Sequence, residues 1–349
     1  EAGSRYKYTV KVNATGLTLE GCTIGSWADG GGESGAAEDL GYIYDSNTNT
    51  YTVYNANGLM NIAELVNGGK SDINITLDTD IDLTGKDWTP IGTDYDNSYK
   101  GTFDGGGHTI TGLTFTTNDE FAGLFGWLNR AGTVKNVVME GVQITSNQIY
   151  GGSIGGVAGY SWGTIENCSV SGSVSGTVYV GGVVGAQIGG SITGCSSSAT
   201  VKGMVDVGGV AGQTNSSATL TACYATGNVI IEINPKKNIA GGSLVGMNAG
   251  SSLLACYATG NVTSTGSSTG YMHIGGFLGN NYTTVTACYW KNNHEQGIGY
   301  NRESTGATKV DGSVVTWQKA VDAMNTALQN AGSRWRYELK GALPTLMKQ

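Results

Sequence analysis

Five cysteines are the residues of this chain whose type and spacing first suggest chemistry. They are Cys168, Cys195, Cys223, Cys256 and Cys288, separated by 27, 28, 33 and 32 residues. Thiols at regular intervals could form disulfides or bind a metal. A disulfide framework is disfavoured because five members leave one unpaired and the sixth cysteine, Cys22, is far away in sequence. A zinc site is disfavoured because the chain has no CxxC pair and no Cys–His spacing of the required kind.

The histidines do not form a peptidase motif. A zincin needs two histidines four positions apart with a glutamate between them. In "NNHEQGIGY", Glu295 follows His294, but glycines and Tyr300 stand where a second ligand would be needed. We interpret this stretch as a surface loop, and His108 in "DGGGHTI" as a structural hydrogen-bonding residue. No G-x-S-x-G elbow of a serine hydrolase occurs, so we predict no catalytic residues.

Carboxylates are the groups that a polysaccharide-processing β-helix enzyme would gather on one outer face. Between positions 150 and 290 the only acids are Glu166, Asp206 and Glu232, each at a different offset from the cysteine of its own repeat. These offsets predict different faces of the fold. Closer to the N-terminus, further acids are weak candidates for calcium, with turn and surface roles favoured for them; they include Asp94, Asp96 and Asp104.

Charge and composition exclude other classes of partner. The net charge is −8, and basic clusters are absent apart from Lys236 and Lys237. Such a surface repels nucleic acid and disfavours anionic polysaccharides. No apolar run of 18 residues occurs, so no membrane-spanning segment is predicted. "DGGG" lacks the lysine and the following helix of a phosphate loop, and we predict no cofactor.

The elements that position the cysteines are sequence repeats. Five segments align, among them "VGGVVGAQIGGSITGCSSSATVKG" at 180–203 and "VGGVAGQTNSSATLTACYATGNV" at 207–229. A degenerate repeat that begins at Phe121 has Val137 at the position of the cysteine. Short β-branched runs between Gly, Asn and Ser predict strands. Paired glycines disfavour a helix, since each costs about 1 kcal/mol against Ala. We therefore predict an all-β fold, a right-handed parallel β-solenoid with one repeat per coil.

This arrangement assigns a place to each recurring side chain. A small residue at one position of every coil predicts an interior column, so we expect the five cysteines to be a structural core. The next position then faces outward. It is occupied by Ser169, Ser196, Tyr224, Tyr257 and Tyr289, with Trp290 beside the last. Stacked tyrosines could simply stabilise the ladder, or Tyr224, Tyr257, Tyr289 and Trp290 could form an aromatic strip that binds a glycan or a protein.

The two ends of the chain differ from the repeats. Leu59, Ile62 and Val66 predict a helix at 57–67, and Trp317, Val321, Met324 and Leu328 predict another at 316–330. We expect both helices to cap the open ends of the solenoid. The predicted organisation is antiparallel strands and a linker at 1–40, the solenoid at 41–315 with clear repeats at 121–290, and a helical cap and tail at 316–349.

The repeats, "VGGVVGAQIGGSITGCSSSATVKG" and "CYATGNV" above all, resemble the GLUG motif. This family occurs in bacterial cell-surface proteins, including adhesins and immunoglobulin A1 protease-like chains. "TIGSWADGGGESG" near the N-terminus resembles the closing strands of fimbrillin-like domains of anaerobic Gram-negative gut bacteria. A chain of this type would be a C-terminal piece that begins inside such a domain.

The two resemblances imply a non-catalytic module, an adhesin or fimbria-associated protein at the cell surface or secreted, associated with a Gram-negative outer membrane. Its partner would be a host glycan or a host surface protein. The alternatives are a polysaccharide-processing β-helix enzyme, a peptidase-associated accessory domain, or a passive stalk without a ligand.

Overall fold

The computed structural model describes residues 12–13, 16–17, 39–149, 151–303 and 306–349. The expected fimbrillin-like segment 1–40, with Cys22, lies almost entirely outside the described residues. Its described part is an antiparallel pair, β1 (Val12–Asn13) and β2 (Gly16–Leu17). A second antiparallel pair, β3 (Tyr42–Asp45) and β4 (Thr50–Val53), leads into the solenoid.

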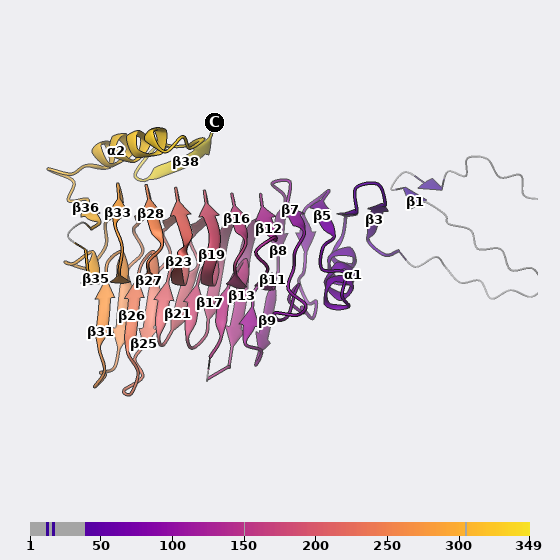
Figure 1. Ribbon diagram of the computed structural model, residues 1–349, viewed down its shortest axis with the longest axis horizontal. Helices are drawn as coiled ribbons and strands as arrows, with labels where there is room; N and C mark the ends of the chain where they lie inside the picture. Colours follow the sequence, from indigo (N-terminus) through magenta and orange to yellow (C-terminus); the bar gives the residue numbers. More distant parts are fainter. Residues whose placement is uncertain (1–11, 14–15, 18–38, 150, 304–305) are drawn as a thin grey trace, which may run out of the picture.

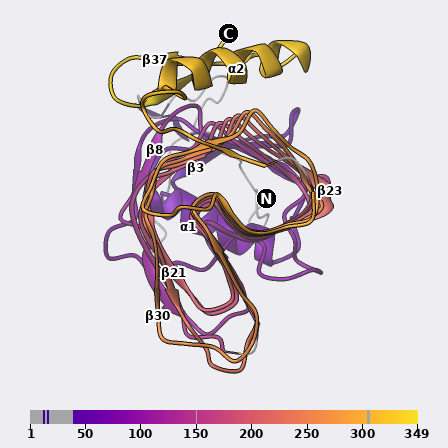
Figure 2. The same cartoon turned by 90° about the vertical axis from the view of Figure 1, so that its left-hand side faces the viewer.

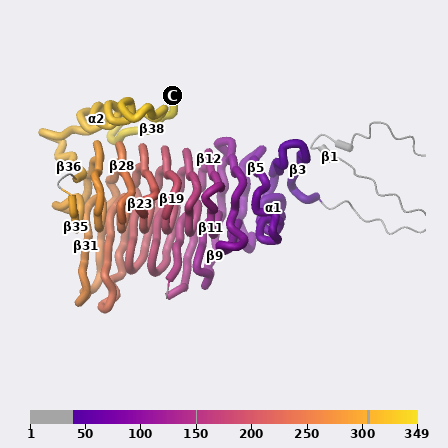
Figure 3. Tube along the Cα trace, in the orientation of Figure 1, coloured from indigo at the N-terminus to yellow at the C-terminus, as the bar shows by residue number. Residues whose placement is uncertain are grey.

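The predicted parallel β-solenoid is confirmed. From β4 onward, each strand of the stack pairs in parallel with its equivalents in the coils before and after it (Figure 1). The coils follow one another from indigo to orange along the tube of Figure 3. Three long sheets result, because each coil contributes strands to three walls. The smallest wall is the six-stranded sheet of β10 (Phe121–Ala122), β14 (Ser153–Gly155), β18 (Tyr179–Gly181), β22 (Asp206–Gly208), β26 (Ile239–Gly242) and β31 (Met272–Gly275).

The other two walls contain 15 and 13 strands. The 15-stranded sheet holds β3, β4, β5 (Asn74–Leu77), β7 (Thr102–Asp104), β11 (Phe125–Leu128), β12 (Thr133–Lys135), β15 (Ala158–Ser161), β16 (Thr164–Glu166), β19 (Val184–Thr193), β23 (Ala211–Thr221), β27 (Val245–Ala249), β28 (Ser252–Leu254), β32 (Leu278–Asn281), β33 (Val285–Thr286) and β35 (Ile298–Asn301). The 13-stranded sheet holds β6 (Ile81–Asp82), β8 (Thr109–Thr111), β9 (Thr114–Thr117), β13 (Val138–Ser146), β17 (Ser169–Ser175), β20 (Ser196–Ser197), β21 (Thr200–Gly203), β24 (Tyr224–Ala225), β25 (Val229–Glu232), β29 (Tyr257–Ala258), β30 (Val262–Thr265), β34 (Tyr289–Trp290) and β36 (Thr308–Lys309).

In six successive coils, a residue with a left-handed backbone conformation forms the turn from the 15-stranded wall into the 13-stranded wall. It stands directly before the cysteine column, and its φ lies between 48° and 65°. Only Gly adopts this conformation without strain, and Asn tolerates it better than other residues. The six residues are Asn136, Asn167, Gly194, Ala222, Ala255 and Ala287.

The cysteine column lies inside the solenoid. All five thiols are buried and free. Each bonds to backbone close by: Cys195 Sγ lies 3.4 Å from Thr193 O and 3.4 Å from the amide nitrogen of Cys168 in the preceding coil. The thiols therefore satisfy backbone groups at the corner of each coil while filling a narrow interior.

The first helix closes the N-terminal end of the core. α1 (Ala56–Asn67) begins after Asn55, whose side chain accepts a 2.9 Å hydrogen bond from the amide of Gly58. Its buried face, which includes Leu59 and Ile62, joins the solenoid core. Figure 1 places α1 at that end of the stack, beside β3 and β5.

The C-terminal segment, residues 316–349, does not cover the other end. We call it the strap: α2 (Trp317–Asn330) followed by the hairpin β37 (Trp335–Leu339) and β38 (Pro344–Lys348). It lies along the flank of the coils, and seen along the stack in Figure 2 it rests against one side of the ring. The apolar stripe of α2 is buried there with Ala222, Ala255 and Tyr257, so these residues supply the apolar partner that the helix needs.

Candidate functional site

The predicted tyrosine column forms, but the strap covers its centre. Tyr224, Tyr257 and Tyr289 are direct neighbours in adjacent strands. The rings of Tyr224 and Tyr257 stack with centroids 4.9 Å apart. Tyr257 is only 1% exposed, whereas Tyr224 and Tyr289 are half-buried. The expectation of an open aromatic strip is therefore wrong at Tyr257, because the apolar stripe of α2 needs a partner.

Trp290 does not extend the strip. It follows Tyr289 in β34, so strand alternation turns its side chain inward. The ring is 2% exposed within the main core, and Lys309 Nζ lies 4.8 Å from its centroid. The expectation that Trp290 stands beside the tyrosines on the outer face is corrected on this point.

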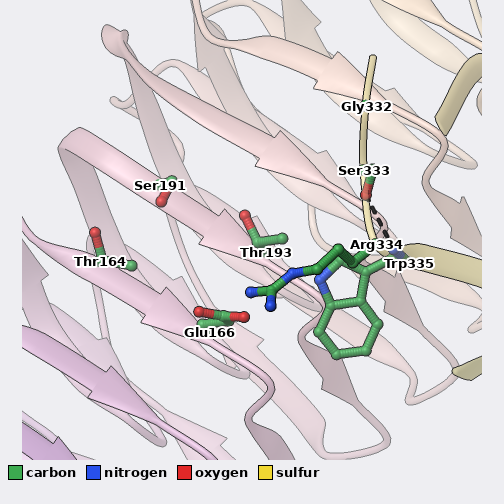
Figure 4. A pocket seen from close by; sticks show the side chains of 8 residues that line it. All are labelled: Thr164, Glu166, Ser191, Thr193, Gly332, Ser333, Arg334 and Trp335. Atoms are coloured by element: carbon green, nitrogen blue, oxygen red, sulfur yellow. Dashed lines mark hydrogen bonds between the residues drawn. The ribbon is translucent and has the colours of Figure 1, made fainter. Parts of the chain in front are cut away.

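Two small cavities flank Trp335 at the margin of the strap. The first, of about 240 Å³, lies between Thr164, Glu166, Ser191 and Thr193 on the solenoid and residues 332–335 of the strap (Figure 4). The second, of about 190 Å³, lies on the side of Ser196 and Tyr224. In the first, Glu166 Oε1 is 2.7 Å from Lys348 Nζ, and Arg334 points from the strap toward Glu166 in Figure 4. The ion pair of Glu166 and Lys348 joins the strap to the solenoid, so we interpret both cavities as part of that seam.

Two of the calcium candidates, Asp94 and Asp104, interact with different protein groups. Asp94 Oδ1 accepts 3.0 Å hydrogen bonds from the amides of Asp96 and Asn97, and these bonds lower the pKa of Asp94. Asp104 instead pairs with Lys135 at 3.1 Å. Over the described ranges, no three His, Cys, Asp or Glu side chains come together as a possible metal site.

A surface that our sequence analysis missed lies where the six-stranded and 15-stranded walls meet. In each coil the chain folds back sharply between these walls across a short turn, and the second residue of the strand that follows is glycine. A side chain at Gly159 or Gly185 would collide with the backbone of the neighbouring wall, so only glycine allows this close approach. The residues on either side of the turn, seven positions apart in most coils, therefore line one continuous corner.

Two columns of side chains make up this surface, which we call the corner. They follow from the strand register. On the six-stranded wall the column is Phe121, Ser153, Tyr179, Asp206, Ala240 and His273. On the 15-stranded wall it is Trp127, Tyr160, Ala186, Gln213, Met247, Asn280 and Tyr300.

Aromatic rings gather at both ends of the corner. At the N-terminal end, Trp127 lies 4.7 Å from Phe121 and 4.2 Å from Tyr160, measured between ring centroids. At the other end His273 stacks on Tyr300 at 5.0 Å. Tyr300 is 42% exposed, and the other rings of these contacts are half-buried. The contacts bridge the two columns, so at each end the two walls share an aromatic cluster.

The middle of the corner is polar and buried. Asp206 is 6% exposed, and loss of solvation raises the pKa of its carboxyl to about 7. Asp206 in turn contributes to the raised pKa of the neighbouring Tyr179, after burial as the main cause. Two coils further on, Asn280 is 9% exposed. One signal of the corner was in the sequence: in four coils these residues flank a "GG..G" pattern.

Comparison with known proteins agrees with this architecture. The GLUG motif matches residues 150–175 and 176–202. The solenoid carries GLUG motifs. The chain resembles the crystal structure of a "putative immunoglobulin A1 protease" from Bacteroides ovatus, with a TM-score of 0.59 over 86% of this chain and 92% of that one. At 18% identity this likeness shows the fold alone.

Two sequence relatives share parts of the chain. "Halomucin" of Haloquadratum walsbyi is 32% identical over 166 residues, 44% of this chain. A "Putative Gly-rich membrane protein" of Evansella cellulosilytica is 34% identical over 131 residues, 35% of this chain. The matched region spans only 2% and 14% of the length of these relatives. Within the described part of this chain, neither helix has the length and apolar character needed to cross a membrane.

Proposed function

We propose that this chain is a non-catalytic bacterial cell-surface module, an adhesin or fimbria-associated protein that displays a binding face on its solenoid. The observation that carries the proposal is the corner, where aromatic rings at both of its ends remain half-buried or exposed while the tyrosine column is occupied by the strap. The partner would be a host glycan or a host surface protein. The location would be the outer surface of a Gram-negative bacterium, or secreted.

Two further observations support a binding role over catalysis. The sequence relatives are named as a halomucin and a membrane protein, and neither name is that of an enzyme. The acidic residues of the repeats are also scattered: Glu166 pairs with Lys348, Glu232 pairs with Lys202, and Asp206 lies in the corner. A glycosidase needs two carboxylates that act on one bond.

The proposal is tested with beads that carry the purified chain, incubated with epithelial cells and with mucin-coated surfaces. We expect wild-type beads to attach, and beads with Trp127→Ala and Tyr300→Ala together to attach less. Tyr44→Ala is the matched control, because Tyr44 is 43% exposed but lies outside the corner. Absence of attachment by wild-type beads would contradict an adhesive role.

A separate assay addresses the peptidase alternative. The purified chain is incubated with immunoglobulin A, with and without added zinc, and the products are examined by gel electrophoresis. We expect no cleavage, since His294 Nε2 lies 3.0 Å from the backbone carbonyl oxygen of Val262 rather than facing another metal ligand. Cleavage that His294→Ala abolishes would overturn the non-catalytic proposal.

A further inference from the structure

Two buried oxygen acceptors of the corner lack a hydrogen-bond donor. Asp206 is 6% exposed as a residue, and its carboxylate takes part in no hydrogen bond or ion pair with the described residues. Asn280 Oδ1 is likewise buried without a donor in that part of the chain. Buried polar atoms are normally paired, and leaving one unpaired is costly. Asp206 and Asn280 lie on one surface, where a donor from outside the chain, either water or a bound ligand, can pair with them.

The position of these acceptors suggests a ligand that extends along the rod. Asp206 and Asn280 lie two coils apart, which corresponds to about 10 Å at the spacing of paired strands. From the coil of Trp127 to that of Tyr300 the corner extends over six coil steps, or about 29 Å. A ligand that contacts the aromatic rings at both ends must have a repeating or extended structure.

The chemistry of the corner selects among extended ligands. Neither column contains Lys or Arg, and the chain carries a net charge of −8, so an anionic polymer is disfavoured. A proline-rich peptide packs well on aromatic rings, but its prolines have no N–H to donate to Asp206 or Asn280. A sugar chain offers apolar ring faces for the aromatic residues and hydroxyl donors in every unit.

We propose that the corner binds an uncharged glycan chain along the axis of the solenoid. Its sugar rings pack on the aromatic residues at the two ends, including Trp127 and Tyr300. Its hydroxyls donate hydrogen bonds to Asp206 and to Asn280 Oδ1. This inference rests on the proposed adhesive function and assigns it a ligand class and a site.

The experiment measures binding of the whole chain to immobilised cellulose, xylan, galactomannan, starch and mucin, with the mucin used before and after removal of sialic acid. We expect at least one uncharged glycan to bind, and Tyr300→Ala to weaken that binding about tenfold, as for loss of one aromatic contact. Tyr44→Ala should leave it unchanged. Tyr300 is exposed in the last strand of its wall, so its removal should leave the fold intact.

A second variant separates binding from folding. Asn280→Met introduces the residue that the preceding coil has at the same place, Met247. It removes the unpaired acceptor, so the melting temperature should stay equal or rise while glycan binding falls about tenfold. A purely structural role for Asn280 predicts the opposite: lower stability and unchanged binding.

Three outcomes overturn the inference. The first is binding of a proline-rich peptide, lost in Tyr300→Ala, with no glycan bound. The second is binding to mucin that disappears when sialic acid is removed. The third is bead attachment to cells without binding to any of these glycans, which would leave the adhesive function standing. Absence of bead attachment would instead contradict the proposed function itself.

Discussion

The hydroxyl of Tyr257 donates a 2.6 Å hydrogen bond to the backbone carbonyl of Pro344, 87 residues further along the chain. The ring also contacts Trp317 of α2 and Tyr337 of β37 edge-on, at centroid distances of 5.3 and 5.8 Å. One side chain of the solenoid thus touches all three elements of the strap. Burial raises the pKa of Tyr257 well above its ordinary value. The strap is therefore docked by specific contacts as well as by its apolar face.

Replacing Tyr257 by serine tests this docking. Serine occupies the equivalent position in earlier coils, as Ser169 and Ser196, and would be harmless if the ring were exposed. Because the ring is buried, we expect Tyr257→Ser to lower the free energy of unfolding by about 3–5 kcal/mol, as for other large aromatic truncations. Urea denaturation followed by circular dichroism measures the change.

The matched control is Tyr224→Ser, one coil earlier in the same column, where the ring is half-buried. We expect a clearly smaller loss of stability there. Equal and small effects at both positions would mean that the strap is not held on this column in solution.

The sequence predicted the tyrosine column but not its cover. Alternation around the cysteines placed Tyr224, Tyr257 and Tyr289 on the outer face, and the apolar stripe of residues 317–328 predicted α2. Nothing in the two local patterns indicated that they face each other, because docking depends on which apolar surfaces remain unpaired once the coils are stacked. In the folded protein, the apolar face of α2 packs on the tyrosine column, so each covers the apolar surface of the other.

The five thiols of the cysteine column should react only slowly with thiol reagents in the folded protein. Burial raises the pKa of Cys195, Cys223 and Cys256 above its ordinary value, which keeps these thiols protonated and unreactive. In a Cys22→Ser background, so that only the five column thiols are counted, we expect slow reaction with a thiol reagent under native conditions. All five should react in denaturant. Rapid native labelling, or loss of thiols through disulfides, would contradict the buried column.

The corner was missed for a physical reason. We followed periodicity along the strand, in which successive residues alternate between faces. The corner instead joins residues seven positions apart, such as Asp206 and Gln213, because the glycine turn folds one wall directly onto the next. The recurring glycines mark the place of this turn in the sequence, but how closely the walls approach, as where Gly212 packs against the backbone of the other wall, is a tertiary contact. Asp206 accordingly looked like a solitary acid rather than a buried one.

Asp206 should make stability depend on pH. Its pKa rises from 3.8 in the unfolded chain to about 7 in the folded one, so the folded state holds the proton more tightly. The contribution of the protonated Asp206 carboxyl to stability is therefore fully present below about pH 4, and it is lost as the pH rises to about 7. Asp206→Asn removes the ionisation. We expect this variant to exceed the wild type at pH 8 by at most about 4 kcal/mol in free energy of unfolding, and to match it at pH 4.

Urea denaturation at intervals from pH 4 to pH 8 measures this difference. Glu232→Gln is a suitable control, since Glu232 forms an exposed ion pair with Lys202 and should give only a small effect. A difference between Asp206→Asn and wild type that stays constant across the pH range would mean that the carboxylate is not desolvated as the fold indicates.

Gly194 offers the sharpest test of how the strap meets the solenoid. It is the left-handed residue of its coil, with φ of 65°, and a side chain built there would overlap the indole ring of Trp335. The next two coils have alanine at this position, Ala222 and Ala255. We therefore expect Gly194→Ala to displace the strap, with a loss of stability well above the roughly 1 kcal/mol that a left-handed alanine costs by itself.

A double-mutant cycle isolates the contact: in a Trp335→Ala background, the same Gly194→Ala change should cost only that backbone strain. Stability is measured by urea denaturation, and strap release by limited proteolysis after residue 315. If Gly194→Ala costs the same with and without the Trp335 ring, then the two residues do not touch and the strap is seated elsewhere on the coils.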